Sequence, residues 1–317
     1  MAERMPLTRA VLLDLATIDR GGDIDLGRLR AACPDWTLHD RTAPGETAAR
    51  LAAADIAVTN KVVLDRAVLA AAPALRLVCI AATGTNNLDL EAARELGVAV
   101  TNVTGYATPA VVQHVFAVML AHATRLMDYD RAARGGAWAR SDQFCLLDYP
   151  IRELAGRTLG IIGFGALGQG IARAAAAFGM QVRFHDPAVP GSETALALAE
   201  AADVLCVACA LTETTRGLVD AAMLEALGPR GVLVNVARGP IVREDALIAA
   251  LEAGGVAGAA LGVFEREPLP ANHPLARFDT VVLGSHNANN GARAVEAVHA
   301  VTLRNLASVL SPAAGRE

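Results

Sequence analysis

The feature that most constrains the fold is an alternation along the chain between short runs of Val, Ile and Leu and longer stretches rich in alanine. Apolar runs of about four to eight residues are typical of strands buried on both faces. Strands that alternate with helices predict parallel βαβ units and therefore an α/β fold. The first runs are RAVLLDLA, DIAVTN, RLVCIAATG and VAVTNV, and a second series contains TLGIIGFG, QVRFHD, DVLCVACA, GVLVNVA, VAGAALGVF and TVVLGS.

The two series predict two lobes, each built on its own doubly wound parallel sheet, with an active-site cleft between them. At 317 residues the chain has room for two domains of ordinary size. The stretch from Pro109 to Trp138 lies between the series and has the spacing of one long helix, whose proline suits a first helical turn. His114 and His122 are too far apart on this helix to share a metal ion, and we expect them to serve helix packing or an interface.

Charge and hydropathy argue against two classes of partner. The net charge is −5 and Lys and Arg form no dense cluster, which argues against nucleic acid. No uncharged apolar run reaches the length of a membrane span, about 18 residues. Asp14 interrupts the apolar stretch near the start, which favours a first strand over a signal peptide.

The cysteines favour a reducing compartment. They number five and are scattered without a disulfide framework, which favours the cytoplasm. Cys206 and Cys209 stand in CVAC with no second pair and no nearby histidine. We interpret them as part of a strand in the core, and we expect no metal site.

A glycine motif predicts a dinucleotide site. IIGFGALGQG holds Gly163, Gly165 and Gly168 in GxGxxG spacing between a strand and an alanine-rich helix. Glycines there permit a tight turn and let backbone N–H groups approach a pyrophosphate. The motif alone is weak, but Asp186 ends the next strand, 18 residues on (186 − 168), where a carboxylate accepts hydrogen bonds from the adenosine ribose. That carboxylate would repel a 2′-phosphate, which favours NAD over NADP. The alternative is a structural glycine turn with a surface aspartate.

Three polar residues follow three later strands. Arg238 follows GVLVNVA, Glu267 lies just past VAGAALGVF, and His286 ends TVVLGS. Because the carboxyl ends of parallel strands point to one edge of a sheet, the three side chains should converge where the reactive ring of the dinucleotide lies. Each has an ordinary alternative: a solvated loop arginine, a surface glutamate before Pro268, or a histidine that caps a strand.

The trio has the groups that reduction of a 2-keto acid requires. Arginine binds a carboxylate and polarises the neighbouring carbonyl. Histidine is the natural donor of the proton that the developing alkoxide needs, and a glutamate beside it favours the imidazolium and fixes its orientation. We therefore expect Arg238, Glu267 and His286 to be catalytic, with His286 as the acid in reduction and the base in the reverse reaction.

Taken together, the motifs resemble the D-isomer-specific 2-hydroxyacid dehydrogenases. They are ATGTNNLDLEAARELGVAVTNVTGY, GFGALGQ, NVARGP, FEREP and SHNANN, and SDQFCLLDYPIRELAGRTLGIIGFG is most similar to the glycerate dehydrogenase (hydroxypyruvate reductase) branch. The resemblance implies the same catalytic trio. It also implies that Gly84 and Thr85 hold the substrate carboxylate and that Lys61 contacts the distal part of the substrate, where the alternative is a solvated lysine. The implied cofactor contacts, besides the glycines, Asp186 and Arg238, are Ala166, Leu167, Cys209, Ala210, Thr215, Val236 and Ala237.

The resemblance further implies the architecture and the assembly. A flavodoxin-like substrate-binding lobe would comprise residues 1–105 and 291–317, the chain returning to it in the helix after Ala292. A Rossmann NAD-binding lobe would comprise residues 106–290. Members of the family are commonly homodimers joined through the cofactor lobe, and the long apolar helix is a candidate part of that interface.

The sequence departs from the family pattern at Gly262, where the family usually has an aspartate that contacts the nicotinamide carboxamide. Loss of that acceptor should loosen the ring by about 1–3 kcal/mol. Ala210 and Ser285 replace prolines, which we expect to matter little.

We expect NADH-dependent reduction of hydroxypyruvate or glyoxylate to the D-hydroxy acid. A phosphorylated substrate is less attractive, because VTNK brings one lysine rather than a cluster. The alternatives are a reductase of another 2-keto acid and a catalytically impaired, dinucleotide-sensing binding protein on the same fold, which Gly262 favours.

Overall fold

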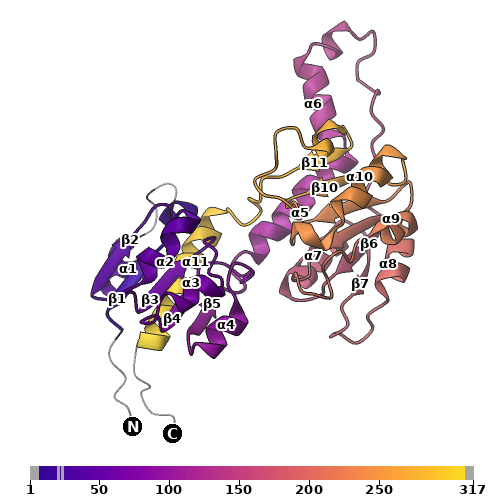
Figure 1. The fold of residues 1–317 in the computed structure, drawn as a ribbon. Helices are drawn as coiled ribbons and strands as arrows, with labels where there is room; N and C mark the ends of the chain where they lie inside the picture. Colours follow the sequence, from indigo (N-terminus) through magenta and orange to yellow (C-terminus); the bar gives the residue numbers. More distant parts are fainter. Residues whose placement is uncertain (1–6, 20–21, 23–24, 311–317) are drawn as a thin grey trace. The chain divides into compact units, whose positions relative to one another are not determined.

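The strands and helices of the computed structural model separate into two compact units (Figure 1). Unit 1 comprises residues 1–107 and 290–317, and unit 2 comprises residues 108–289. The structure describes residues 7–19, 22 and 25–310. Each unit is built on one sheet whose strand pairs are all parallel, so the predicted α/β class with two parallel sheets is confirmed.

Within the described residues, unit 1 has a five-stranded sheet in the order β2-β1-β3-β4-β5. Helices α2, α3 and α4 pack their apolar side chains on one face of it, and α1 and α11 pack on the other. The strands are β1 Arg9–Leu12, β2 Asp35–Leu38, β3 Ile56–Thr59, β4 Leu77–Ile80 and β5 Ala99–Asn102; the helices are α1 Leu26–Ala31, α2 Thr47–Leu51, α3 Arg66–Ala70, α4 Leu90–Glu95 and α11 Ala292–Leu310, with 3-10 turns η1 Leu15–Thr17 and η2 Pro44–Glu46.

Unit 2 has a six-stranded sheet in the order β11-β10-β9-β8-β6-β7 in the part of the chain that is described. Alternate residues of its strands point to opposite faces, so α5 and α7 pack on one side and α8, α9 and α10 on the other. The strands are β6 Thr158–Ile162, β7 Gln181–His185, β8 Val204–Val207, β9 Val232–Asn235, β10 Gly258–Leu261 and β11 Val281–Leu283; the helices are α5 Thr108–Ala123, α6 Leu126–Arg134, α7 Ala166–Ala177, α8 Ala195–Ala201, α9 Ala221–Leu227 and α10 Glu244–Glu252, with η3 Trp138–Arg140, η4 Gly239–Ile241 and η5 Pro274–Arg277.

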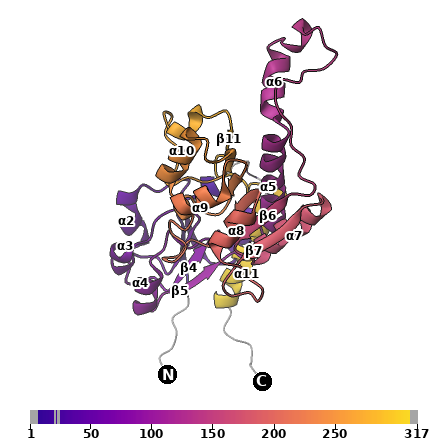
Figure 2. The same cartoon turned by 90° about the vertical axis from the view of Figure 1, so that its right-hand side faces the viewer.

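The prediction of one long helix between the series was wrong. α5 ends at Ala123 and α6 starts at Leu126, and the two are bent by 61° (Figure 2). Arg125 at the break has a left-handed φ of 54° and pairs with the buried Asp128, while the Thr124 hydroxyl donates back to the Leu120 carbonyl. Among the described helices none is by itself long and apolar enough to cross a membrane; α5 and α6 meet that length and composition only as a bent pair.

Candidate active site

The glycine turn lies where the order of the strands reverses in the sheet of unit 2. β6 has β7 on one side and β8 on the other, so the loops after β6 and β8 meet at a switch point, where doubly wound sheets bind ligands. Gly163 has φ +92°, and a Cβ on it would lie 2.6 Å from the backbone of Cys209. A Cβ on Gly168 would overlap the Gly163 carbonyl. Both glycines are therefore required for the close approach of the turn to its neighbours.

Asp186 braces this turn from the end of β7. Its Oδ2 accepts a hydrogen bond from Phe164 N at 2.8 Å, and its Oδ1 accepts one from Ala188 N at 3.1 Å. Each carboxylate oxygen can accept a second hydrogen bond, so the group can still receive a ribose diol. Gly165 caps the N-terminus of α7, and no described atom lies within 4 Å of the place of a Cβ there. The open turn at a helix N-terminus fits the pyrophosphate of a dinucleotide.

The other predicted cofactor residues lie at the same edge of the sheet. Ala166 and Leu167 form the first turn of α7. Cys209 packs against Gly163, and burial raises the pKa of its thiol to about 11, so it stays neutral. The Thr215 hydroxyl donates to the Ala210 carbonyl at 2.7 Å, which folds this segment into a turn. Cys206 is fully buried in β8, and Val236 and Ala237 follow β9 in buried positions.

A buried amide shapes the turn that carries Arg238. Asn235 ends β9 and is 1% exposed. Its Oδ1 accepts a hydrogen bond from Ala237 N at 3.1 Å, and its Nδ2 donates to the Arg238 carbonyl at 3.0 Å. Arg238 Nη1 donates to the Ala237 carbonyl at 2.7 Å. Asn235 was not predicted as a site residue, although a polar residue at the end of a buried apolar strand was a usable signal.

Gly239 presses the Arg238 turn against the segment that carries Glu267. A Cβ on Gly239 would overlap the backbone of Phe264 and Glu265. Phe264 N in turn donates a hydrogen bond to Glu267 Oε1 at 3.0 Å. The turns after β9 and β10 are thus in backbone contact, and only glycine permits it.

Glu267 and His286 form a direct pair across the ends of the adjacent strands β10 and β11. Glu267 Oε2 lies 2.6 Å from His286 Nδ1, and the two side chains are about one third exposed, at 33% and 31%. A carboxylate on Nδ1 selects the tautomer protonated there or stabilises the imidazolium, and it leaves Nε2 to face a substrate.

The backbone of His286 is strained. Its φ is 53°, in the left-handed region, which costs a residue other than glycine about 1–3 kcal/mol. The hydrogen bond from His286 N to the Gly262 carbonyl, at 3.0 Å, helps to hold this conformation. Backbone strain persists only where the surrounding structure holds the residue in place, and residues strained in this way cluster at functional sites.

Two further glutamates anchor the segment before Glu267. Glu265 N donates to Glu244 Oε1 at 2.6 Å, and Glu244 N donates to Glu265 Oε1 at 3.2 Å. His273 Nε2 lies 3.3 Å from Glu244 Oε2. These residues were not predicted from the sequence, because they act on the backbone through contacts between separate loops.

The predicted substrate residues of unit 1 lie at the carboxyl edge of its own sheet. Lys61 follows β3 and is exposed. Gly84 and Thr85 lie in the turn after β4, the neighbour of β3. Asn87 Nδ2 donates to the Val62 carbonyl at 3.0 Å, which links the two turns.

Comparison with known proteins identifies the family of the chain. Residues 116–288 match the model of the D-isomer specific 2-hydroxyacid dehydrogenase, NAD binding domain. The chain belongs to the D-isomer specific 2-hydroxyacid dehydrogenases. A putative 2-hydroxyacid dehydrogenase of Haemophilus influenzae is 41% identical over 245 residues, 76% of this chain and 78% of the relative. The glycerate dehydrogenase of Methylorubrum extorquens is 40% identical over 229 residues, 71% of this chain and 72% of the relative.

A solved structure of the same family matches the fold of this dehydrogenase. It is the NADPH-dependent glyoxylate/hydroxypyruvate reductase of Sinorhizobium meliloti in complex with NADP and malonate, with a TM-score of 0.83, 29% identity and coverage of 96% of this chain and 94% of that one. The chain is therefore an oxidoreductase of 2-hydroxy acids with a site for a nicotinamide dinucleotide.

At Gly262, where the resemblance implies an aspartate, a buried polar atom lies close to the place that a side chain would take. A Cβ on Gly262 would lie 3.5 Å from the Asn235 carbonyl oxygen and 3.7 Å from His114 Nε2. His114 Nε2 is buried and, among the described residues, has no hydrogen-bond partner. Burial lowers the pKa of His114, so its imidazole is neutral near neutral pH. A Cβ at position 262 would therefore make only ordinary van der Waals contacts.

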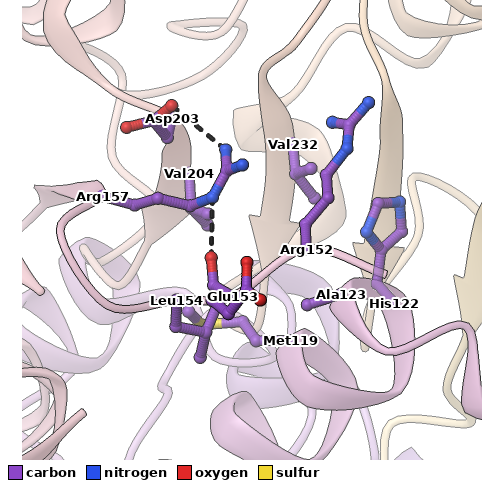
Figure 3. A pocket seen from close by; sticks show the side chains of 10 residues that line it. All are labelled: Met119, His122, Ala123, Arg152, Glu153, Leu154, Arg157, Asp203, Val204 and Val232. Carbon is purple, nitrogen blue, oxygen red and sulfur yellow. Dashed lines mark hydrogen bonds and ion pairs between the residues drawn. The ribbon is translucent and has the colours of Figure 1, made fainter. Parts of the chain in front are cut away.

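A hollow at the opposite edge of the same sheet is separate from the active site of this dehydrogenase. Its lining includes Val204 and Val232, which begin β8 and β9, and Arg157, which pairs with Asp203 at 3.2 Å (Figure 3). The candidate catalytic residues follow the other ends of the strands.

No group of three or more His, Cys, Asp and Glu residues in the described ranges is arranged to hold a metal ion.

Proposed function

We propose that this dehydrogenase uses NADH to reduce a small 2-keto acid, hydroxypyruvate or glyoxylate, to the D-2-hydroxy acid. The observation that carries the proposal is the Glu267–His286 pair, 2.6 Å from Oε2 to Nδ1, at the strand ends beside the Arg238 turn. The names of the relatives support the choice of substrate, since they include a glycerate dehydrogenase and a glyoxylate/hydroxypyruvate reductase.

In the proposed mechanism, each catalytic residue has one role. The Arg238 guanidinium binds the substrate carboxylate and polarises the carbonyl oxygen. NADH, when bound, supplies the hydride to the carbonyl carbon. His286 Nε2 gives its proton to the oxygen that becomes the hydroxyl, while Glu267 at Nδ1 holds the ring and stabilises its charged form. In the oxidative direction neutral His286 takes the proton back.

The decisive test is the loss of NADH absorbance with hydroxypyruvate, glyoxylate, pyruvate and 3-phosphohydroxypyruvate, for the wild type and for His286→Ala. We expect turnover of the first two substrates and a fall in kcat of about 10²–10⁴-fold in the variant, with NADH affinity retained. Comparable turnover in the variant would refute the role of His286. NADH binding without turnover of any keto acid by the wild type would favour the second candidate, a dinucleotide-sensing protein. Gly262, in place of the aspartate that the resemblance implies, supports that candidate.

The preference for NADH rests on Asp186, whose carboxylate would repel a 2′-phosphate, and on Pro187 and Ala188 after it in place of arginines. We expect kcat/KM to be at least about tenfold higher with NADH than with NADPH, equivalent to about 1.4 kcal/mol. The Sinorhizobium meliloti relative is NADPH-dependent, so the comparison of the two cofactors is informative. Equal use of both cofactors would refute the assignment.

We also propose a homodimer formed through unit 2. α6 and the segment after it extend away from the sheet of unit 2 in both views (Figures 1 and 2). Several large apolar side chains of this region are exposed. Phe144 is 90% exposed and Leu147 is 80% exposed, which in water favours a partner surface. Light scattering should give the mass of two chains, and the double variant Phe144→Asp, Leu147→Asp should give the mass of one.

The cysteines are unpaired, which supports the cytoplasm as the location of the protein. Cell fractionation can check this location.

A further inference from the structure

The carboxylate of Asp14 is buried at the carboxyl edge of the sheet of unit 1. Asp14 follows β1 and is 3% exposed. A buried carboxylate is costly unless its oxygens are hydrogen-bonded. Here Oδ2 accepts from Lys61 N at 2.7 Å, and Oδ1 accepts from Asn60 N at 2.9 Å and from the Thr59 hydroxyl at 3.0 Å.

The same loop is tied to the chain after β1 by a side chain of its own. Asn60 Nδ2 donates to the Thr17 carbonyl at 3.2 Å and contacts the Thr17 hydroxyl at 3.1 Å. The Thr17 hydroxyl also contacts Asp14 Oδ2 at 3.2 Å. Val62 N donates to the Thr59 hydroxyl at 3.0 Å. The direction in which Lys61 leaves the loop is therefore set mainly by Asp14 and its neighbours.

This loop lies where the sheet of unit 1 presents its ligand-binding edge. β1, β3 and β4 are adjacent, so the residues after them share one edge. That edge carries the exposed Lys61 after β3 and the Gly84–Thr85 turn after β4. A cation beside a backbone turn suits an anionic or polar group of a small substrate.

We propose that Asp14 is a positioning residue for substrate specificity: it fixes the loop so that the Lys61 ammonium is presented to the distal group of the keto acid. Asp14 acts through Lys61 and does not touch the substrate. The inference deepens the proposed function and rests on it. The distal group is a hydroxymethyl in hydroxypyruvate and a hydrogen in glyoxylate, so Asp14 should matter for the first substrate and little for the second.

Asparagine is the informative substitution, because its shape is the same but one oxygen becomes an NH₂ that cannot accept the loop N–H groups. Asp14→Asn should raise KM for hydroxypyruvate about tenfold while KM for glyoxylate changes less than about twofold. Lys61→Met should do the same, and the double variant should be no worse than Lys61→Met alone, because both act on one contact.

The matched control is Asp55→Asn at the opposite edge of the same strands. Asp55 Oδ2 accepts hydrogen bonds from Thr8 N and Arg9 N, both at 3.0 Å, where β1 begins. This variant should lower Tm and leave the ratio of the two KM values as in the wild type. A second readout is amide hydrogen exchange, which Asp14→Asn should accelerate at Asn60 and Lys61 and Asp55→Asn should not.

Each outcome decides the question. An unchanged KM ratio in Asp14→Asn, additive effects in the double variant, or the same change of ratio in Asp55→Asn would overturn the proposal. Failure of the proposed function is recognised separately, because the wild type would then turn over neither keto acid, and the role in specificity would fall with it. Hydrogen exchange would still show whether Asp14 holds the loop.

Discussion

Replacing Gly239 with alanine should separate the two segments that carry the proposed catalytic residues Arg238 and Glu267 without changing either side chain. The Cβ of the alanine would lie well inside 3.0 Å of the backbone of Phe264 and Glu265, a distance that real Cβ atoms essentially never show. Backbone atoms cannot rotate away as a long side chain can. The Arg238 turn and the Glu267 segment must therefore part until ordinary contact, 3.4 Å or more, is restored.

The size of the effect follows from that displacement. Parting the segments takes about 1 Å or more, and a displacement of that size at a catalytic site costs about 10²-fold in rate. Overpacking of this kind costs about 1–3 kcal/mol of stability. The glycine turn is held separately, by the hydrogen bond from Phe164 N to Asp186 and by the packing of Cys209 against Gly163, so NADH affinity should change little.

Three measurements on Gly239→Ala test the reasoning: kcat/KM with hydroxypyruvate, the NADH dissociation constant by fluorescence, and Tm. Gly45→Ala is the control for the substitution itself, because Gly45 is exposed and has no atom within 4 Å of the place of a Cβ among the described residues. The reasoning is refuted if Gly239→Ala keeps wild-type kcat/KM while remaining folded. A parallel loss of NADH affinity would show that the damage spreads beyond the two segments.

Three further changes test other contacts of unit 2. Glu267→Gln keeps the size of the side chain but removes the charge at His286 Nδ1, so kcat should fall roughly 10²–10⁴-fold while NADH still binds; a change below twofold in stopped-flow turnover would contradict the pairing. Gly262→Asp has room beside His114 Nε2, 3.7 Å from the new Cβ, and should tighten NADH binding about tenfold by restoring an acceptor; weaker binding in a fluorescence titration would count against this. Burial lowers the pKa of His122 to about 4, so between about pH 6.5 and pH 4 the unfolded chain binds more protons than the folded one. The free energy of unfolding should therefore decrease by roughly 3 kcal/mol as pH falls through that window, and urea titrations should show a flatter profile for His122→Gln; an equally steep profile would assign the loss to other groups.

Much of the architecture could be predicted because it depends on local patterns. Buried strands need continuous apolar runs, helices need their own spacing, and the alternation of the two forces parallel pairing. One strand in the described part of the chain was missed: β2, Asp35–Leu38, which lies at the edge of its sheet and alternates exposed with half-buried residues. The break between α5 and α6 was also missed, because Arg125 adopts a left-handed φ that its residue type does not announce.

Part of the candidate site could likewise be predicted from local patterns, and part could not. The order of residues along the chain was enough to predict that Gly163 and Gly168 form a turn between strand and helix, and that Arg238, Glu267 and His286 follow strands whose ends share an edge. These are consequences of chain order and of the polarity of a parallel sheet.

Which side chains are in contact could not be predicted before the fold was known. Three contacts join loops that are separated in the chain. They are the 2.6 Å contact of Glu267 with His286, the packing of Gly239 against Phe264, and the hydrogen bond from Lys61 N to Asp14. Such contacts depend on strand order, register and loop conformation together, none of which a residue's immediate neighbours specify. Hydrogen bonds and close packing act over a few ångströms, so their partners emerge only when the fold has brought those loops together.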